Sequence, residues 1–112
     1  MIHQMKLKND PFERIKSGKK IIEIRLYDEK RRKIEIGDYI EFTNLESGEK
    51  IIVKVIKLHL FETFKDLFNH FDSSYFGHDN LDYNKMYEYY TKEEEKEYGV
   101  FGIEIRKENG DE

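Results

Sequence analysis

The sequence predicts one mixed α+β domain, in which a small and strongly bent β-sheet closes into a barrel with helices at its side. The chain has 112 residues, enough for a single domain of ordinary size. Residues 21–56 show the alternation and the β-branched runs of strands. Residues 61–71 and 83–90 change to the spacing of amphipathic helices, and a strand-like segment follows at 100–105.

Composition limits the class of protein. Charged residues make up 39% of the chain and aromatic residues 14%, which is typical of a soluble globular domain. The absence of cysteine excludes a disulfide scaffold and a thiolate metal site. No apolar run approaches the roughly 20 residues of a membrane span, and residues 1–6 lack the apolar region of a signal peptide. We therefore expect a cytoplasmic protein without membrane contact, and we favour a monomer.

Charge is unevenly distributed along the sequence. The formal net charge is -4, so the overall field does not attract nucleic acid, and any contact with phosphate must rest on a local cluster of cations. Such a cluster lies in the first third of the chain: Lys16, Lys19, Lys20, Arg25, Lys30, Arg31, Arg32 and Lys33. Acidic residues crowd the other end: Glu93, Glu94, Glu95 and Glu97.

The first predicted element is a short helix from Asp10 to about Ser17. Asp10 is suited to the N-cap, Pro11 to the first helical position, and Glu13 to closing a capping box. Gly18 follows, and glycine readily adopts the left-handed conformation that ends a helix.

A strand is predicted directly after this helix. Ile22, Ile24 and Leu26 point to one face, while Glu23 and Arg25 point to the other. The strand therefore has an apolar face and a face that carries charge.

A hairpin is predicted next. Residues 28–33 form a charged loop, and the Gly-Asp pair at 37–38 forms a turn before a strand at 39–42. Turn residues at 44–48 precede a β-branched strand at 50–56, which we expect to pair with the preceding strand. The first half of the chain therefore forms a small sheet.

The second half is predicted to be mainly helical. Aromatic and leucine side chains recur at three and four residues over 61–71, and their face is expected to pack on the sheet. After a polar loop at 72–80, residues 83–90 return to helical spacing. Thr91 and Glu94 then form a second capping box that opens another helical turn.

The last predicted strand, at 100–105, completes the sheet. We assign residues 1–107 to a single domain, and 108–112 to a flexible C-terminal tail.

The residues Gly18-x-Lys20-x-x-Glu23-x-Arg25 resemble the GxKxxExR signature of ASCH domains, a branch of the PUA-like β-barrel superfamily. Residues 36–42 are similar to the barrel hairpin that follows this signature, and residues 98–103 to the family's last strand. The resemblance covers nearly the whole chain in the right order. It implies a small mixed PUA-like β-barrel with flanking helices, partly open, with a cleft at the signature.

The resemblance also implies a class of ligand. Some ASCH domains bind RNA, some are ribonucleases, and one group hydrolyses the amide of N4-acetylcytidine. We therefore expect RNA, or a nucleotide or modified nucleoside, as the partner.

The signature residues suit such a ligand chemically. Glu23 and Arg25 lie on one strand face with Cα atoms roughly 6.5 Å apart, so they can share a ligand. Arg25 offers a planar donor fork and Lys20 a mobile cation, while Glu23 can accept from an exocyclic amine or hold Lys20 in place. We add Arg31, whose loop through Lys33 would aid phosphate contact, and Tyr98, one of several tyrosines suited to stacking on a base. The alternative is an ion-paired sheet face that binds nothing.

A hydrolase is the alternative function. The amidohydrolases place a threonine nucleophile where this chain has Glu23, so that chemistry does not transfer directly. If the protein is an enzyme, Glu23 would act as general base on water and Lys20 would stabilise the oxyanion. The catalytic acid stays unassigned, because several residues compete for it: Asp72, Asp79, Asp82 and Glu94.

Other functions have less support. The four histidines lack metal-ligand spacing, and no Gly-rich nucleotide motif is present, so we expect neither a metal nor a cofactor. A third hypothesis is a protein-interaction domain that uses the acidic segment Thr91 to Glu97. The sequence favours RNA or nucleotide binding around Lys20, Glu23 and Arg25.

Overall fold

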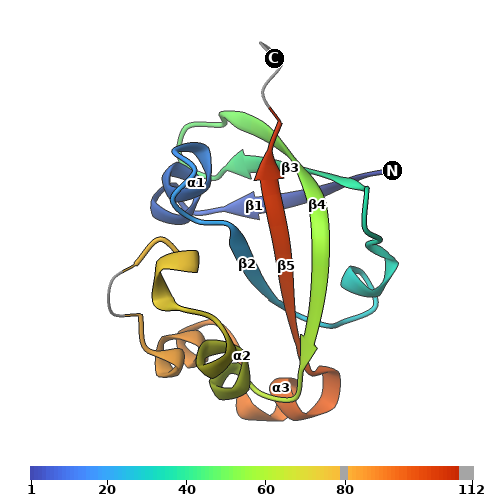
Figure 1. The fold of residues 1–112 in the computed structure, drawn as a ribbon, viewed down its shortest axis with the longest axis vertical. Helices are drawn as coiled ribbons and strands as arrows, with labels where there is room; N and C mark the ends of the chain where they lie inside the picture. The colour runs from blue at the N-terminus through green and yellow to red at the C-terminus, as the bar shows by residue number, and fades with distance from the viewer. Residues whose placement is uncertain (79–80, 109–112) are drawn as a thin grey trace.

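The computed structural model describes residues 1–78 and 81–108. Its centre is one five-stranded sheet with the order β1-β3-β4-β5-β2, bent into a half-barrel (Figure 1). β1 and β3 pair in parallel, and every other neighbouring pair is antiparallel. The strands are β1 (Ile2–Leu7), β2 (Ile22–Leu26), β3 (Tyr39–Asn44), β4 (Lys50–Phe61) and β5 (Val100–Lys107). The predicted α+β fold, a strongly bent barrel-like sheet with flanking helices, is confirmed, and the sheet stays partly open because β1 and β2 do not pair with each other.

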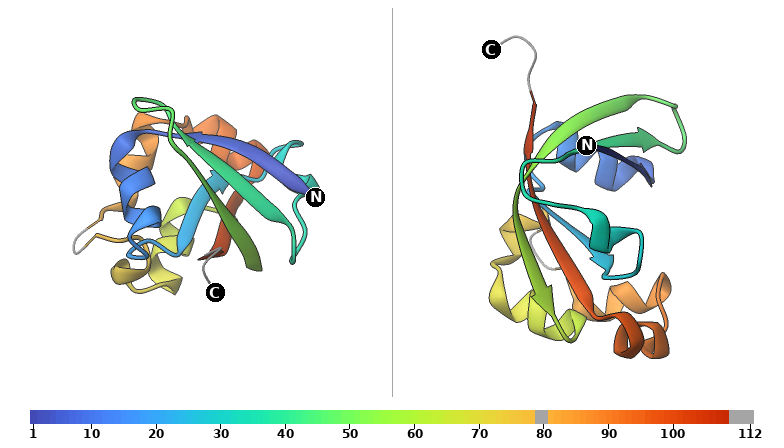
Figure 2. Two further views of the ribbon diagram at one scale, coloured as in Figure 1. Left: turned by 90° about the horizontal axis from the view of Figure 1, so that it is seen from above. Right: turned by 90° about the vertical axis from the view of Figure 1, so that its right-hand side faces the viewer.

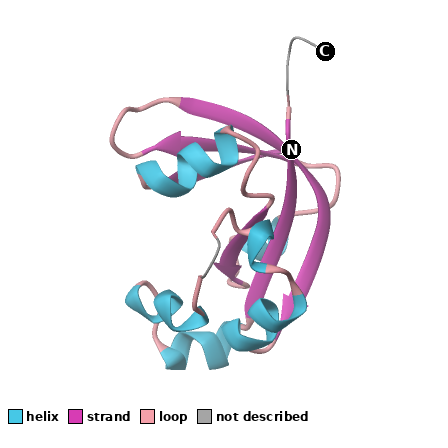
Figure 3. Cartoon of the chain, turned by 60° about the vertical axis from the view of Figure 1, so that its left-hand side comes forward, coloured by secondary structure: helices cyan, strands magenta, loops and turns pink. Residues whose placement is uncertain are grey.

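Helices gather at the two ends of this sheet (Figure 3). They are α1 (Asn9–Lys16), α2 (Phe64–His70) and α3 (Lys92–Tyr98), with short 3-10 helices η1 (Arg31–Lys33), η2 (Ser73–Tyr75) and η3 (Tyr83–Glu88). Within residues 1–78 and 81–108, no helix is long and apolar enough to cross a membrane.

β4 connects the two parts of the sheet. Its first residues pair with β3, and from Val53 to Phe61 it pairs with β5. The register shifts between Val55 and Lys57, and such a bulge bends a strand and increases its twist. Figure 2 shows the resulting curvature of β4.

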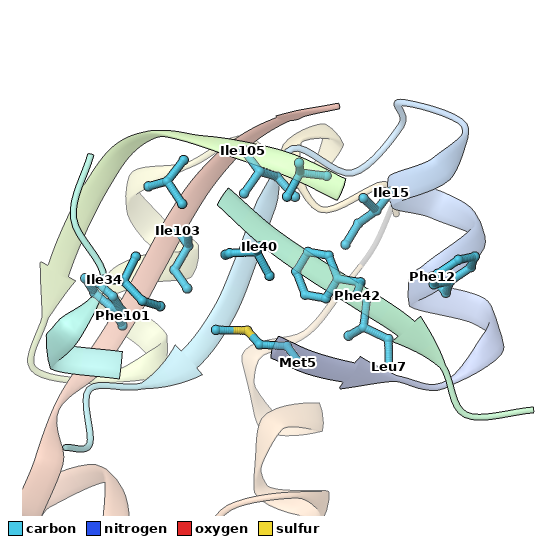
Figure 4. Close-up of a cluster of buried hydrophobic side chains, with 12 residues drawn as sticks. Met5, Leu7, Phe12, Ile15, Ile34, Ile40, Phe42, Phe101, Ile103 and Ile105 are labelled. Carbon is cyan, nitrogen blue, oxygen red and sulfur yellow. The ribbon is translucent and has the colours of Figure 1, made fainter. Parts of the chain in front are cut away.

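Two clusters of apolar side chains stabilise the fold. The first fills the half-barrel beneath α1, with members from β1, β3, β4 and β5 (Figure 4). The second lies between the other face of β2 and the segments α2 and η3. The apolar face of β2 is therefore packed in the second cluster, and its pairing with β5 turns the charged face toward the half-barrel.

β1 is a strand that was not predicted from the sequence. Met5 and Leu7 are buried in the inner cluster, whereas Gln4 and Lys6 between and beside them are exposed. This alternation indicates a strand, but it covers only a few residues. The strand also pairs in parallel with β3, more than 30 positions away, and no local pattern predicts such a pairing.

The predicted start of α1 was wrong. The helix begins at Asn9, with Lys8 in the N-cap position and no side-chain cap. Residues far along the chain bind its first residue. Glu46 accepts a hydrogen bond from the Asn9 backbone N–H at 3.0 Å, and the Asn44 amide donates one to the Asn9 side chain at 3.0 Å. The β3–β4 turn therefore replaces the predicted capping box. Gly18 has a φ of 83°, which confirms its expected place after the helix.

Two further boundaries differ. Phe61 belongs to β4, where it pairs with Val100, and α2 begins at Phe64 with Thr63 as its N-cap. The helical spacing at 83–90 corresponds to the 3-10 helix η3. The hairpin of β3 and β4, the last strand and the Thr91–Glu94 capping box are confirmed. Of the predicted tail at 108–112, residues 109–112 lie outside the described residues.

Candidate functional site

The charged face of β2 points into the half-barrel. Glu23 pairs with Ile103 of β5, and Arg25 pairs with Phe101. Directly opposed residues of two strands project from the same side of a sheet, and both β5 residues belong to the inner apolar cluster. Glu23 is only 3% exposed as a result. A buried carboxylate needs charged or hydrogen-bonding partners, and the signature supplies them.

Glu23 is bound by one cation on each oxygen. The Lys20 Nζ lies 2.9 Å from Oε1, and the Arg25 Nε lies 2.7 Å from Oε2. The Lys20 backbone N–H also donates to the Arg14 carbonyl at 3.0 Å, which fixes the position of Lys20 between α1 and β2. Both carboxylate oxygens are therefore occupied by the protein itself.

Arg25 also crosses the open side of the half-barrel. β1 and β2 are the two edge strands of the sheet, and the Arg25 Nη2 donates to the Lys6 carbonyl of β1 at 3.0 Å. Among the described residues, the Arg25 Nη1 has no hydrogen-bond partner. The guanidinium therefore joins the two edges and keeps donors for a ligand.

The electrostatics follow from this arrangement. Burial alone would raise the pKa of Glu23, but the charges and hydrogen bonds of Lys20 and Arg25 outweigh burial and lower the pKa to about 2. Glu23 is therefore ionised at neutral pH and holds both cations in place.

A cleft of about 510 Å³ opens above this network. The positively charged residues that line it outnumber the carboxylates by six to two, an excess of four charges in a chain whose net charge is -4. The cations are Lys6, Lys8, Arg14, Lys20, Arg25 and Lys85, and the carboxylates are Asp10 and Glu23. The cleft concentrates positive charge that the composition of the whole chain conceals.

The wall opposite α1 is apolar and aromatic. It comes from η3 and the residues that flank it, including Leu81, Met86 and Tyr90. The Tyr90 ring stacks on buried Phe64, with ring centroids 5.7 Å apart. Burial raises the pKa of Tyr90, so its hydroxyl stays protonated, and it makes no hydrogen bond to residues 1–78 or 81–108. The cleft thus combines cations with a surface on which a base can pack.

The structure brings together three of the five predicted site residues. Lys20, Glu23 and Arg25 form the network, whereas Arg31 does not line the cleft and bonds to Asp28 at 3.3 Å. Tyr98 lines a different hollow, of about 740 Å³, beside α3.

The candidate catalytic acids of the second half do not line the cleft where they are described. Asp72 accepts from Ser74, Asp82 caps η3, and Glu94 forms the capping box of α3. Asp79 lies outside the described residues. Within the described part of the chain, no group of three or more His, Asp or Glu side chains is placed to hold a metal ion.

Sequence reasoning missed much of the cleft. Arg14 lies inside the predicted helix without a functional role, Lys8 lies outside every predicted element, and Lys6 lies in the strand that was not predicted. Tyr90 was one of many tyrosines, and no local signal marked it. Long-range packing alone places these residues beside Arg25.

Comparison with known proteins decides the family. A model of the ASCH domain matches residues 5–109, nearly the full length. The chain belongs to the ASCH domain family.

Solved structures agree with this assignment. The crystal structure of a hypothetical protein named PH0355 is 37% identical, with a TM-score of 0.85, and the match covers 96% of this chain and 100% of that one. The solution structure of protein PF0455 from Pyrococcus furiosus is 34% identical, with a TM-score of 0.75 and coverage of 96% and 97%.

A more distant neighbour shares the fold. A mutant of the ASCH protein from Zymomonas mobilis is 13% identical, with a TM-score of 0.69, and the match covers 98% of this chain and 75% of that one. The comparison with curated proteins finds no match.

Proposed function

We propose that this ASCH domain binds RNA, or a nucleotide or modified nucleoside, in the cleft above Lys20, Glu23 and Arg25. The carrying observation is the excess of four positive charges among the lining residues of an acidic protein. Binding of a polyanion rests on cations near its phosphates, and a local cluster serves this purpose whatever the net charge.

The shape and chemistry of the cleft support a nucleotide over a simple anion. Five of its six cations come from β1, α1, β2 and the segments next to them, and the wall around η3 adds aromatic rings together with the sixth cation, Lys85. A nucleotide needs both kinds of surface, because its base stacks on aromatic rings and its phosphate pairs with cations. The protonated Tyr90 hydroxyl adds a donor for a base edge.

Binding without hydrolysis is the better-supported activity. A general base has a pKa near the working pH, whereas the pKa of Glu23 is about 2. Each of its oxygens also accepts from a cation, Lys20 or Arg25, which holds the carboxylate ionised and lowers its basicity. Glu23 is better suited to positioning the two cations than to proton transfer.

The test is a titration of labelled single-stranded RNA at about 50 and 200 mM salt, with the RNA recovered and sized afterwards. The variant Lys6→Ala/Lys8→Ala removes two exposed lining cations whose ammonium groups form no ion pair with the described residues; Lys8 lies over the Tyr89 ring at 5.2 Å. If the wild type contacts two phosphates, its affinity falls about sevenfold between the two salt concentrations. The double variant should bind more weakly and show a shallower salt dependence.

Lys57→Ala is the matched control, because Lys57 is an exposed lysine on β4 that lines none of the described hollows. Intact RNA with these affinities supports the binding module. RNA fragments produced by the wild type alone would replace it with a ribonuclease. No binding of RNA, mononucleotides or acetylated nucleosides would overturn the proposal and direct the search to protein partners of the acidic α3 surface.

A further inference from the structure

A second hollow adjoins the cleft. It has a volume of about 530 Å³ and is lined by Arg14, Lys19, Ser74, Gly77 and His78. Arg14 and His78 also line the cleft, so the two spaces meet at these side chains.

Gly77 forms the boundary between the two spaces. Its carbonyl accepts a hydrogen bond from the Arg14 guanidinium, whose Nε donates to Asp10 at 3.0 Å. A Cβ atom at Gly77 would lie 3.3 Å from both the Arg14 Cδ and the Lys20 Cβ, and the Gly77 φ is +74°. Only glycine fits without strain where the chain passes this closely between the two cations. The Arg14 guanidinium is therefore held between the cleft and the hollow by two partners, the Gly77 carbonyl and the Asp10 carboxylate.

The hollow carries positive charge without a lining carboxylate. Its lining includes Arg14 and Lys19 but no Asp or Glu. Lys19 is exposed and forms no ion pair or hydrogen bond with residues 1–78 or 81–108. The Ser74 hydroxyl already donates a hydrogen bond to the Asp72 carboxylate at 3.0 Å. Lys19 is therefore the lining cation most available to an anion.

Lys19 and Lys20 line different spaces. They are consecutive residues, with Cα atoms about 3.8 Å apart. Lys19 lines the hollow and Lys20 lines the cleft. Two neighbouring cations that serve two adjoining spaces match a ligand with repeated negative charges along a chain.

We propose that the hollow is a phosphate subsite for the nucleotide that adjoins the one in the cleft. The ligand class of the protein is then an oligonucleotide of at least two residues and not a free nucleoside. This inference rests on the proposed function, since it places the second residue relative to a nucleotide bound above Lys20. Lys19 and Arg14 contact the second phosphate, while Lys20 and Arg25 contact the first residue.

The experiment compares a nucleoside monophosphate with a dinucleotide that carries a 5′-phosphate, by calorimetric titration at two salt concentrations. The wild type should bind the dinucleotide about 5- to 10-fold more tightly than the mononucleotide. Lys19→Ala should abolish most of this advantage and leave the affinity for the mononucleotide within about twofold of wild type. It should also reduce the salt slope for the dinucleotide by about 0.7, the value for one phosphate contact on a single strand.

Lys57→Ala again serves as the matched control and should change neither affinity. Equal affinity of the wild type for the two ligands would overturn the subsite and leave the proposed function standing. An equal loss for both ligands in Lys19→Ala would also overturn it, because Lys19 would then act on the cleft itself. If the wild type binds neither ligand, the proposed function fails, and the subsite fails with it.

Discussion

Glu23 and Glu95 are both buried carboxylates beside a hollow in the surface, but different groups stabilise them. Glu23 is bound by two cations, Lys20 and Arg25. Glu95 is 6% exposed and is bound by neutral donors: the Phe64 backbone N–H at 2.7 Å and the Tyr87 hydroxyl at 2.9 and 3.1 Å.

The difference shows that a buried carboxylate can help to form a binding site or can only stabilise the fold, depending on the groups that bind it. The donors around Glu95 are fully used on it, and they connect α3, η3 and the start of α2. Burial and the Glu95 carboxylate raise the pKa of Tyr87 to about 12, so its hydroxyl remains a donor. The donors around Glu23 are cations with N–H groups to spare, and they line a cleft. A buried carboxylate that gathers cations therefore presents positive charge to a ligand.

The hollow near Glu95 has the opposite charge. Three glutamates, Glu62, Glu95 and Glu97, line it together with one lysine, Lys96. Tyr98 lies there, so a nucleotide that stacked on it would meet carboxylates and not the cations of the cleft. This acidic hollow is the surface that the protein-interaction hypothesis would use.

The largest expected effect comes from removing the carboxylate of the cleft. Glu23→Ala leaves Lys20 and Arg25 close together without their shared counter-charge, in a buried position. We expect the free energy of unfolding to fall by about 3–5 kcal/mol, as for other buried pairs that lose one partner. Chemical denaturation measures this value. Glu95→Ala removes hydrogen bonds from neutral donors and should cost less, about 1.5–3 kcal/mol. The reverse order would contradict the comparison.

The second prediction is a pH dependence that belongs to Glu23. Its pKa is about 2 in the folded protein against a reference value of 4.5, so the unfolded chain takes up the proton first. The stabilisation is therefore complete above pH 4.5 and is lost as the pH falls through the folded-state pKa near 2. Between pH 5 and pH 2.5, wild type should lose about 2 kcal/mol more stability than Glu23→Gln. Urea denaturation at the two pH values provides the comparison, and parallel losses in both proteins would refute it.

The smallest expected effect separates two tyrosines at the end of η3. Tyr87→Phe removes a hydrogen bond to a charged group and should cost about 1.5 kcal/mol. Tyr90→Phe removes a hydroxyl that bonds to no described residue, so stability should change by less than about 0.5 kcal/mol. Thermal denaturation and RNA titration of both variants test the difference. Ligand affinity should fall only for Tyr90→Phe, and an unchanged affinity of that variant would place the Tyr90 hydroxyl outside the ligand contacts.

The sequence by itself determined the local part of this protein. Alternation over three isoleucine and leucine positions of β2 required Glu23 and Arg25 to share the opposite face, and Lys20 lies close enough along the chain to reach Glu23. The hairpin, the last strand and the Thr91 cap also follow from neighbouring residues, because turns, caps and alternation are short-range patterns.

Only the tertiary structure decided what surrounds those residues. Lys6 meets Arg25 across the open side of the half-barrel, and Tyr90 completes the opposite wall from 65 positions further along the chain. The start of α1 is likewise set by the β3–β4 turn and not by its own residues. These contacts join segments far apart in sequence, and their geometry comes from the packing of two apolar clusters, one inside the half-barrel and one between β2 and the segments α2 and η3. Local patterns carry no information about such distances, so the charged strand and its place in a cleft were predicted, whereas the residues that form the other walls of the cleft were not.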